Sequence, residues 1–584
     1  MSAPVTGAPG RAEVAERVAA VRALLAAEGL DGVLVGSDDR FLNEYVPRSD
    51  STRTWLTGFT GSTGDAFLGR DTGFVAVDGR YYLQADEQCG GGPFEVVRVA
   101  LGVPVLQTLC ERVARWARET GARRVAFAPG RVSARARATL EAALGTGCEL
   151  VGVRPSLVER ARGVAPEELR PLRAVAPGPG GGAVRGKLAR LAPALAAAGV
   201  SACVVQKLDE LAWLTNLRGD ELPYQATFRA AGLLRAERVV TGLPGPERAA
   251  SPEDGVELAA AALGQELDAA LAGVRPGERV GYDPVGTTAA ALEALRAAGA
   301  EPVELASPIA PVRARKAPEE LAAMRAALEL ADRVMEEAIA GVQARLDAGQ
   351  RVTETDAADL VEAGFRARGA VGLSFQVIAG AGANGAHIHG RPDPTREIAE
   401  GELVLVDMGG YFHEGYATDL TRTFLAGSAS EPTPAQRERY TRVLQAAIAG
   451  MSARFPRGTR GEQLDALVRR PMWAHGLDYQ HGTGHGVGVN VHEAPPRIST
   501  QPSTALEEGQ VFSIEPGLYV QGWGGIRIEN LCTVAPLADA PGFLEVVPLT
   551  FAAFDRRLID EALLSSDERA WLERYEARGA EARG

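Results

Sequence analysis

The chain has 584 residues, of which 46 % are hydrophobic and 23 % are charged, and its formal net charge is -13. At roughly 150 residues per domain, this length predicts three or four domains with sizeable hydrophobic cores. The acidic balance argues against a nucleic-acid partner and against an anionic membrane surface, because both require a basic face on the protein. No stretch of 18 uncharged apolar residues occurs, so no membrane span is predicted.

The cysteines and the N-terminal segment indicate a reducing compartment. Five cysteines are scattered along the chain without paired CxxC spacing, a pattern typical of reduced thiols rather than of a disulfide framework. The N-terminal segment mixes charges with its apolar positions, which predicts an amphipathic helix rather than a secretion signal. We therefore expect a cytoplasmic protein.

An internal repeat organises the first half of the chain. An Ala- and Leu-rich segment ends at Gly29, a similar one ends at Gly199, and each is followed by a short apolar run and later by a Trp-Leu-Thr tripeptide, at Trp55 and Trp213. Glycine commonly ends a helix, so the repeat predicts two related α/β domains before residue 312. The first copy has about twelve additional residues near 43–54, and we expect these to form a projecting arm.

Two composition changes suggest the domain boundaries. Residues 175–186 are rich in Pro and Gly without periodic apolar positions, which predicts a linker or a long surface loop. Pro318 opens a helical pattern with Leu321, Met324 and Leu328 on one face, so a third domain starts close to it. We place three domains at residues 1–160, 161–312 and 313–554, followed by a tail over 555–584.

Candidate chemistry is concentrated in the third domain. All seven histidines lie between residues 387 and 492, and histidine is a frequent metal ligand that also titrates near neutral pH. Singly, a histidine is usually hydrogen-bonded within the structure and an aspartate at a strand end is usually a turn cap. The combination of these histidines with several acids inside apolar segments favours a metal site.

The acids lie in two predicted hairpins. Asp407 and Asp419 belong to one hairpin and Glu515 and Glu529 to the other, each acid following or lying in an apolar strand pattern. Burying such acids is costly unless they are paired or bind a metal. The glycine-rich segment between the hairpins carries His485, four positions after His481. Four carboxylates and one imidazole suit a hard or borderline divalent ion such as manganese.

The motifs VDMGG, TDLTRT, HGTGHG, IEPG and IRIEN resemble those of the pita-bread metallopeptidases, whose metal ligands follow the order Asp, Asp, His, Glu, Glu. WLTGFTGSTG, VDGRYYLQA and DELAWLTNLRG resemble the two creatinase-type N-terminal domains of the three-domain Xaa-Pro aminopeptidases, and the C-terminal segment resembles their helical tail. The expected fold class is therefore a multidomain α/β and α+β protein, with two related creatinase-type α/β domains before a pita-bread metallopeptidase domain.

The resemblance implies a metal-dependent aminopeptidase that removes the N-terminal residue from peptides with proline at the second position, using a metal-activated water. It implies two divalent metal ions, with Mn(II) as the first choice, and a homodimer without nucleic-acid or membrane partners. The implied metal ligands are Asp407, Asp419, His485, Glu515 and Glu529, with Asp419 and Glu529 bridging the ions. The implied catalytic residues are His389, His481, His492 and Glu515, and the implied second layer, which orients the ligand carboxylates, is Arg422 and Arg527.

Two alternative functions and one departure from the family pattern remain. A prolidase-type Xaa-Pro dipeptidase shares all five ligands, and a metal-free pseudoenzyme would keep the fold as a peptide- or protein-binding module. Asp407 and Asp419 lie twelve positions apart, one more than the family usually has, which places an additional residue near 412–414. We expect the turn to absorb it, because an additional residue within a strand would turn one carboxylate to the opposite face.

Overall fold

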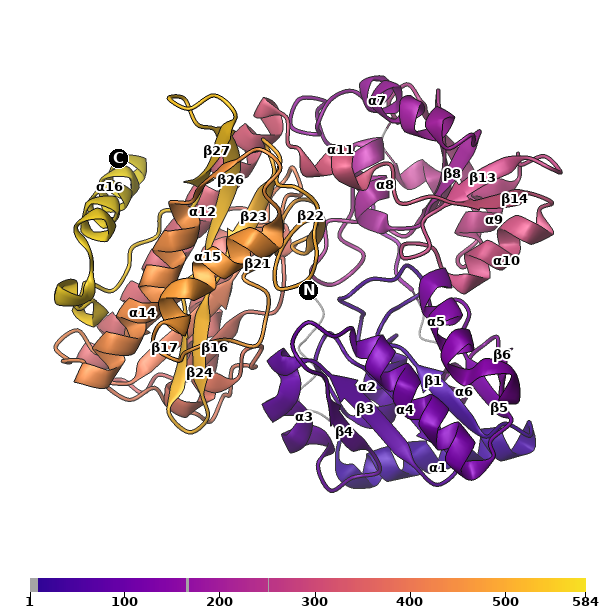
Figure 1. Ribbon diagram of the computed structural model, residues 1–584, viewed down its shortest axis with the longest axis horizontal. Helices are drawn as coiled ribbons and strands as arrows, with labels where there is room; N and C mark the ends of the chain where they lie inside the picture. The colour runs from indigo at the N-terminus through magenta and orange to yellow at the C-terminus, as the bar shows by residue number, and fades with distance from the viewer. Residues whose placement is uncertain (1–8, 164–166, 250, 584) are drawn as a thin grey trace.

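The computed structural model describes residues 9–163, 167–249 and 251–583, which form three lobes (Figure 1). The first lobe (residues 11–162, indigo to purple) and the second lobe (residues 173–314, purple to pink) lie on one side of the molecule. The third lobe (residues 318–583, pink to yellow) forms the other side and includes a C-terminal helix. In the described part of the chain, no helix is long and apolar enough to cross a membrane.

The first lobe is a six-stranded mixed sheet covered by helices, with the strand order β4-β3-β2-β1-β5-β6. Its strands are β1 (Gly32–Val35), β2 (Asp65–Gly69), β3 (Gly73–Val77), β4 (Glu95–Arg98), β5 (Arg124–Phe127) and β6 (Glu149–Gly152). Its helices are α1 (Arg11–Ala27), α2 (Thr52–Thr57), α3 (Tyr82–Cys89), α4 (Val105–Thr120), α5 (Ala134–Leu144) and α6 (Leu157–Arg162).

The second lobe repeats this arrangement, with the strand order β12-β11-β10-β8-β13-β14. Its strands are β8 (Ala202–Val205), β10 (Ala231–Arg235), β11 (Val239–Pro244), β12 (Val256–Ala261), β13 (Arg279–Tyr282) and β14 (Glu301–Glu304), with a short pair formed by β7 (Arg173–Ala174) and β9 (Leu217–Arg218). Its helices are α7 (Val184–Ala197), α8 (Leu208–Thr215), α9 (Glu266–Leu271), α10 (Ala289–Ala297) and α11 (Ala310–Ala314).

The two lobes have the same topology, which confirms the predicted repeat. β1 pairs antiparallel with β2 and parallel with β5, and β8 pairs antiparallel with β10 and parallel with β13. Gly29 and Gly199 both adopt a φ of 64° just after the first helix of each lobe, a left-handed conformation that glycine reaches without steric cost. The fully buried strands β1 and β8 follow these turns.

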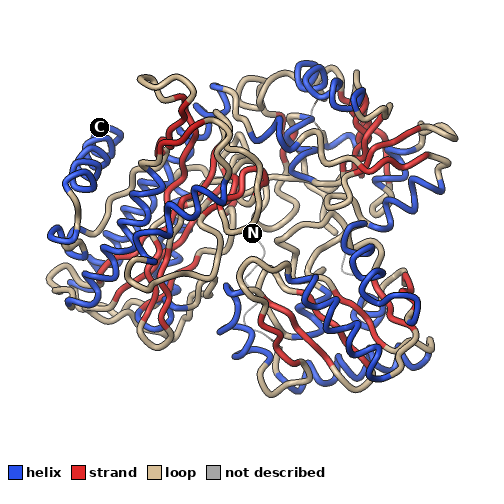
Figure 2. The backbone as a smooth tube through the Cα atoms, viewed as in Figure 1, coloured by secondary structure: helices blue, strands red, loops and turns tan. Residues whose placement is uncertain are grey.

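The third lobe contains a three-stranded sheet, β16-β17-β19, and a six-stranded sheet, β20-β27-β26-β23-β21-β22, and Figure 2 shows long helices running beside their strands. The helices are α12 (Pro318–Asp347), α13 (Glu354–Ala367), α14 (Pro434–Met451), α15 (Gly461–Trp473) and α16 (Ser566–Arg583). The strands are β15 (Gly372–Leu373), β16 (Ile378–Ala381), β17 (Leu403–Met408), β18 (Gly410–Tyr411), β19 (Leu420–Leu425), β20 (Arg454–Pro456), β21 (Gly484–Gly486), β22 (Glu493–Ile498), β23 (Val511–Ile514), β24 (Gly517–Val520), β25 (Gly524–Arg527), β26 (Asn530–Pro536) and β27 (Phe543–Pro548).

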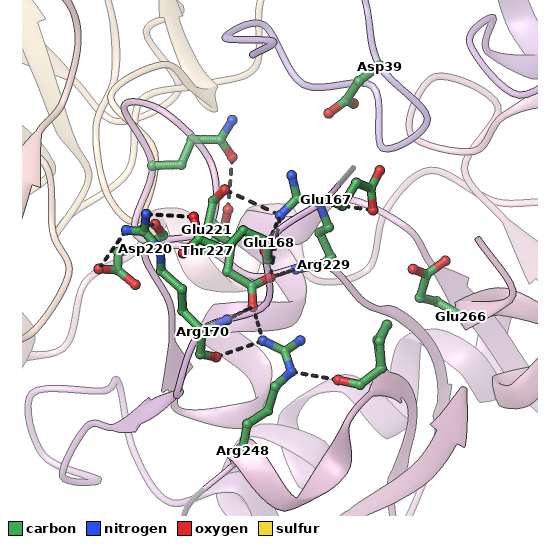
Figure 3. A network of polar contacts seen from close by, with 12 residues as sticks. Asp39, Glu167, Glu168, Arg170, Asp220, Glu221, Thr227, Arg229, Arg248 and Glu266 are labelled. Atoms are coloured by element: carbon green, nitrogen blue, oxygen red, sulfur yellow. Dashed lines mark hydrogen bonds and ion pairs between the residues drawn. The ribbon is translucent and has the colours of Figure 1, made fainter. Parts of the chain in front are cut away.

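Glu167, in the segment between the first two lobes, pairs with Arg229 of the second lobe (Figure 3) and with Arg40 of the first lobe. Arg40 of the first lobe pairs with Glu167 and, at 2.8 Å, with Glu266 of the second lobe. Arg229 reaches Glu167 at 3.3 Å. Glu167 is therefore paired with one arginine from each of the first two lobes.

The Pro- and Gly-rich stretch at 175–186, for which composition predicts a linker or a long surface loop, is partly buried, and its last residues, from Val184, begin α7. Gly180 and Gly181 are buried, and the hydroxyl of Tyr416 in the third lobe donates to the Pro179 carbonyl at 2.7 Å. A Cβ atom at Gly181 would come within 2.8 Å of the indole nitrogen of Trp213. The glycines therefore let this segment pack closely between the second and third lobes.

A buried ionic group joins the second lobe to the third. Arg313 of α11 is 1 % exposed and lies 2.5 Å from Asp209 of α8 and 3.4 Å from Glu493 of β22. Lys316 reaches the same Glu493 oxygen at 3.3 Å. Because these charges are removed from water, each depends on its partners for compensation.

Replacing Asp209 tests how much this contact stabilises the protein. Asp209→Ala leaves the Arg313 guanidinium buried with incomplete compensation, so we expect a loss of about 3 kcal/mol in the free energy of unfolding. Chemical denaturation followed by fluorescence measures it. Asp254→Ala is the control, because it breaks an exposed pair with Arg185 and should leave stability unchanged. Equal effects of the two substitutions would contradict this interpretation.

Candidate metal centre

The first hairpin brings Asp407 and Asp419 to one face of its sheet. β17 and β19 are antiparallel, with Asp407 opposite Thr421 and Met408 opposite Leu420. The same register continues to the bridge between Tyr411 and Ala417 next to the turn. Because side chains alternate along a strand, Asp407, Asp419 and Thr421 share one face. The additional residue therefore lies in the turn at 412–416, as expected, and reverses neither carboxylate.

The second hairpin does the same for Glu515 and Glu529. Ile514 pairs with Asn530 on one side of these residues, and Gly517 pairs with Arg527 on the other. A single register therefore runs through the hairpin and places the two glutamates opposite each other. Arg527, two positions before Glu529, projects from the same face.

His485 lies on β21, which borders β23 in the six-stranded sheet. A Cβ atom at Gly484 would overlap the Ser513 carbonyl, so glycine is required for the two strands to approach. The Ser513 hydroxyl accepts a hydrogen bond from the His485 amide at 3.1 Å. The absence of a side chain at Gly484 therefore brings His485 against β23.

The five predicted ligand residues meet in one cluster. Nε2 of His485 lies 3.5 Å from a carboxylate oxygen of Asp419 and 3.5 Å from one of Glu515. Potential ligand atoms of Asp419, His485 and Glu529 all lie within 4.8 Å of one another. Asp407 is held beside them by the Arg527 guanidinium, which donates to its Oδ2 at 2.6 Å.

The carboxylates of Asp419, Glu515 and Glu529 resist ionisation in the metal-free protein. Burial, followed by the charges of Glu529 and Asp407, raises the pKa of Asp419 well above its ordinary value. Burial and the charge of Glu515 raise the pKa of Glu529. Burial also raises the pKa of Glu515 to about 7, although the Arg527 charge opposes it. Four acids in one buried cluster therefore favour a compensating positive charge.

The residues present fit a site for divalent cations. Oδ1 of Asp407 is buried and has no hydrogen-bond partner among the described residues, so its lone pairs are available to a ligand. Burial lowers the pKa of His485 to about 3, which keeps its imidazole neutral, the form that coordinates metals. The donor set of carboxylate oxygens and one imidazole nitrogen matches borderline divalent ions.

The predicted catalytic histidines surround the cluster. Nδ1 of His481 lies 4.0 Å from Glu515, and its Nε2 lies 3.0 Å from the Tyr519 hydroxyl. The ring of His492 lies perpendicular to that of His485, with centroids 4.3 Å apart. His389 lies on the side of the first lobe, where its Nδ1 is 2.7 Å from the Tyr81 hydroxyl.

The first lobe reaches this cluster, and the expectation of a projecting arm at 43–54 is wrong. Glu44 accepts a hydrogen bond from Nδ1 of His492 in the same chain at 2.6 Å, and the Tyr45 ring stacks near that of His492. Burial lowers the pKa of His492, but the Glu44 carboxylate raises it above its ordinary value. The start of this segment therefore contacts the chain's own site instead of extending away from it, and its last residues, from Thr52, belong to α2 of the first lobe.

The expected direct contact of Arg422 with a ligand carboxylate is not among the hydrogen bonds of the described residues, and Arg422 instead holds the main chain beside two ligands. Arg422 lies on the opposite face of β19 from Asp419, three positions away, and donates to the main-chain carbonyls of Thr421 and Glu529. The predicted contact holds for Arg527, which donates to Asp407. Strand alternation distinguishes the two arginines in the sequence: Arg422 lies an odd number of positions from Asp419 and faces away, whereas Arg527 lies two positions from Glu529 and shares its face.

The remaining three histidines lie outside the cluster, and three polar residues that were not predicted contact the predicted site residues. His387 pairs with Glu87 at 3.0 Å between the first and third lobes, while His413 lies in the hairpin turn and His475 is exposed after α15. Thr421, whose hydroxyl donates to Glu529 at 2.7 Å, was not predicted, although it lies two positions after Asp419. Tyr81 and Glu44 were also missed, because their contacts span lobes.

Comparisons with known proteins match this geometry. The model of metallopeptidase family M24 matches residues 322–536, the creatinase/prolidase N-terminal domain matches residues 17–164 and again 168–320, and the C-terminal region of peptidase M24 matches residues 542–581. A probable Xaa-Pro aminopeptidase P of Sordaria macrospora is 33 % identical over 95 % of this chain and 94 % of its own. The chain belongs to metallopeptidase family M24. An Aspergillus niger relative of the same description is also 33 % identical, over 97 % of this chain and 95 % of its own.

Solved structures of M24 relatives separate two architectures. An X-prolyl aminopeptidase from Caenorhabditis elegans, described as a cytosolic enzyme with a di-nuclear active site, is 26 % identical with a TM-score of 0.86 and covers 97 % of this chain and 96 % of its own. A prolidase from Pyrococcus horikoshii is 25 % identical with a TM-score of 0.53, and it covers 64 % of this chain and 100 % of its own. This M24 chain therefore has the fold predicted for it, two creatinase-type domains followed by a pita-bread domain.

Cation binding by this cluster should depend on pH. Because the pKa of Glu515 is raised to about 7, a cation must displace a proton below that pH, so affinity should fall as the pH decreases from 8 to 6, by roughly tenfold for each unit per proton released. Calorimetric titration of the metal-free protein with manganese, repeated in buffers of different ionisation enthalpy, measures both the affinity and the proton release. An affinity independent of pH over this range would contradict the assignment.

Proposed function

We propose that this M24 metallopeptidase removes the N-terminal residue from peptides whose second residue is proline. The observation that carries the proposal is the buried cluster of four carboxylates and one imidazole, gathered from two hairpins and β21. Relatives described as Xaa-Pro aminopeptidases match nearly the whole chain, which supports this substrate class.

Two divalent cations would be held by Asp407, Asp419, His485, Glu515 and Glu529. When bound, the cations would activate a water as nucleophile and polarise the scissile carbonyl. The di-nuclear site of the C. elegans relative and the unpartnered Oδ1 of Asp407 support this assignment. Manganese is the proposed metal, because the donor set is rich in carboxylates and contains no thiolate.

The side chains around the cations would have separate roles in proton transfer, charge stabilisation and positioning. Glu515 would accept the proton of the attacking water and pass it to the leaving nitrogen. His492 and His389 would stabilise the charge that develops on the carbonyl oxygen and orient the peptide. His481 lies on the Glu515 side of the site, 3.0 Å from the Tyr519 hydroxyl. Arg527 would hold Asp407 in place.

The dipeptidase alternative is less well supported than the aminopeptidase. The Pyrococcus prolidase covers 64 % of this chain, whereas the C. elegans aminopeptidase covers 97 %. A metal-free pseudoenzyme is disfavoured because all five ligand residue types are present and lie in one cluster. We further propose a cytoplasmic homodimer, from the family resemblance and the cytosolic relative; sedimentation of the purified protein tests the dimer.

A peptidase assay tests the proposed function. Metal-free protein supplied with manganese should release arginine from Arg-Pro-Pro, and cleave Xaa-Pro-Xaa peptides faster than Xaa-Pro dipeptides. Glu515→Ala should lower kcat by at least about a thousandfold, because it removes both a metal ligand and the proposed proton acceptor. Failure to release the first residue with manganese, cobalt or zinc would overturn the proposal, and a preference for dipeptides would favour a prolidase.

The contribution of the first lobe to catalysis can be measured at Tyr81. Tyr81→Phe keeps the buried ring but removes the hydroxyl that contacts His389 and Ser62, so we expect kcat/KM to fall about tenfold in a protein that stays folded, with the melting temperature lowered by a few degrees at most. The matched control is Tyr82→Phe, which removes a hydroxyl that donates to the Val99 carbonyl within the first lobe. An unchanged kcat/KM in Tyr81→Phe would show that His389 needs no support from this lobe.

A further inference from the structure

Tyr575 of the C-terminal helix α16 contacts the strands of the cluster. Its side chain is 3 % exposed, and its ring packs against those of Phe551, Phe554 and Trp571 at centroid distances of 5.4, 4.8 and 5.2 Å. This packing fixes the ring, so that its hydroxyl lies beside the side chains of Arg422 and Asn530. The rest of the helix is largely exposed.

The Tyr575 hydroxyl lies where the segments of Asp419 and Glu529 meet, and in the described part of the chain these segments belong to different sheets. Asp419 precedes β19 in the three-stranded sheet, whereas Glu529 precedes β26 in the six-stranded sheet. The two segments meet where the Glu529 amide donates to the Thr421 carbonyl at 3.2 Å. The separation of these two carboxylates therefore depends on local contacts at the junction rather than on a shared strand register.

Arg422 connects the segments of Asp419 and Glu529 through hydrogen bonds to both main chains. One guanidinium nitrogen, Nη1, donates to the Thr421 carbonyl at 2.8 Å and to the Glu529 carbonyl at 2.7 Å. It thus holds the main chain of both segments, and hydrogen bonds from a charged donor are among the stronger ones. The other terminal nitrogen, Nη2, donates to the Tyr575 hydroxyl at 2.9 Å.

Tyr575 contacts the other segment as well. Its hydroxyl accepts a hydrogen bond from Nδ2 of Asn530, the residue after Glu529, at 2.9 Å and donates to the Ala552 carbonyl at 3.1 Å. Two accepted bonds and one donated bond satisfy the hydrogen-bonding capacity of this oxygen. By strand alternation, Arg422 projects from the face opposite Asp419, and Asn530 from the face opposite Glu529. The Tyr575 hydroxyl therefore joins the two segments on the side away from the carboxylates.

We propose that Tyr575 is a positioning residue for the metal centre, with its hydroxyl fixing the separation of Asp419 and Glu529 through Arg422 and Asn530. The inference rests on the proposed function, because it requires these carboxylates to bind the same cations. It gives the C-terminal helix a role in the chemistry of the site, in addition to covering apolar surface. Outer hydrogen-bond partners of metal ligands commonly change metal affinity by about ten- to a hundredfold when removed.

The experiment compares Tyr575→Phe with Tyr575→Ala in the full-length protein. Phe keeps the ring packing and loses the three hydrogen bonds, whereas Ala loses both. We expect Tyr575→Phe to weaken binding of at least one manganese ion about tenfold in calorimetric titration of the metal-free protein. At saturating manganese we expect a lower kcat with an unchanged KM for Arg-Pro-Pro. Tyr82→Phe, in the first lobe, is the matched control and should behave as wild type.

A role in packing alone predicts a different result. In that case Tyr575→Phe would match wild type in manganese affinity and kcat, while Tyr575→Ala would lower the melting temperature, and that result would overturn the proposal. Because the titration needs no turnover, it decides the role of Tyr575 even if the wild-type protein releases no residue from Xaa-Pro peptides. That failure would count against the proposed substrate alone.

Discussion

The burial of four carboxylates where two sheets of the third lobe meet is the constraint on which the rest of the site depends. Asp419, Glu515 and Glu529 all have raised pKa values, from burial first, and Arg527 supplies one positive charge beside them. Such a cluster is costly to keep ionised without cations. The continuous registers of both hairpins, the close approach at Gly484 and the clamp at Arg422 all serve to hold these anions together.

The three-lobe arrangement places residues from distant parts of the chain around that cluster. The first lobe contributes Tyr81 and Glu44 to His389 and His492, and the second lobe is fixed to the third through Arg313 and Glu493. Glu167, between the first two lobes, pairs with Arg40 of the first lobe and with Arg229 of the second, and Figure 3 shows the pair with Arg229. The site is therefore a property of the whole chain, although the four clustered carboxylates all come from the third lobe.

Local patterns in the sequence were sufficient to predict the parts of the site that local structure determines. Strand alternation and hairpin signals located Asp407, Asp419, Glu515 and Glu529, and the repeat at Gly29 and Gly199 predicted two N-terminal domains of one topology. The contacts of Glu44 and Tyr81 with the third lobe were not predictable in this way, because they join residues more than 300 positions apart. Motif proximity suggested that Arg422 would contact a ligand carboxylate, but Thr421 occupies the face that contacts Glu529, and Arg422 reaches the ligand segments through their main chain. The arm at 43–54 was misplaced because an insertion in sequence carries no information about the surface it contacts.

The central claim is that this cluster holds two divalent cations between the hairpins. Anomalous diffraction from crystals grown with manganese, recorded on both sides of its absorption edge, tests it most directly. The account predicts two manganese peaks in each chain, both in contact with Asp419 and Glu529, with His485 beside one and Asp407 beside the other. Crystals that diffract well but show no peak among these carboxylates, or peaks elsewhere in the chain, would contradict it.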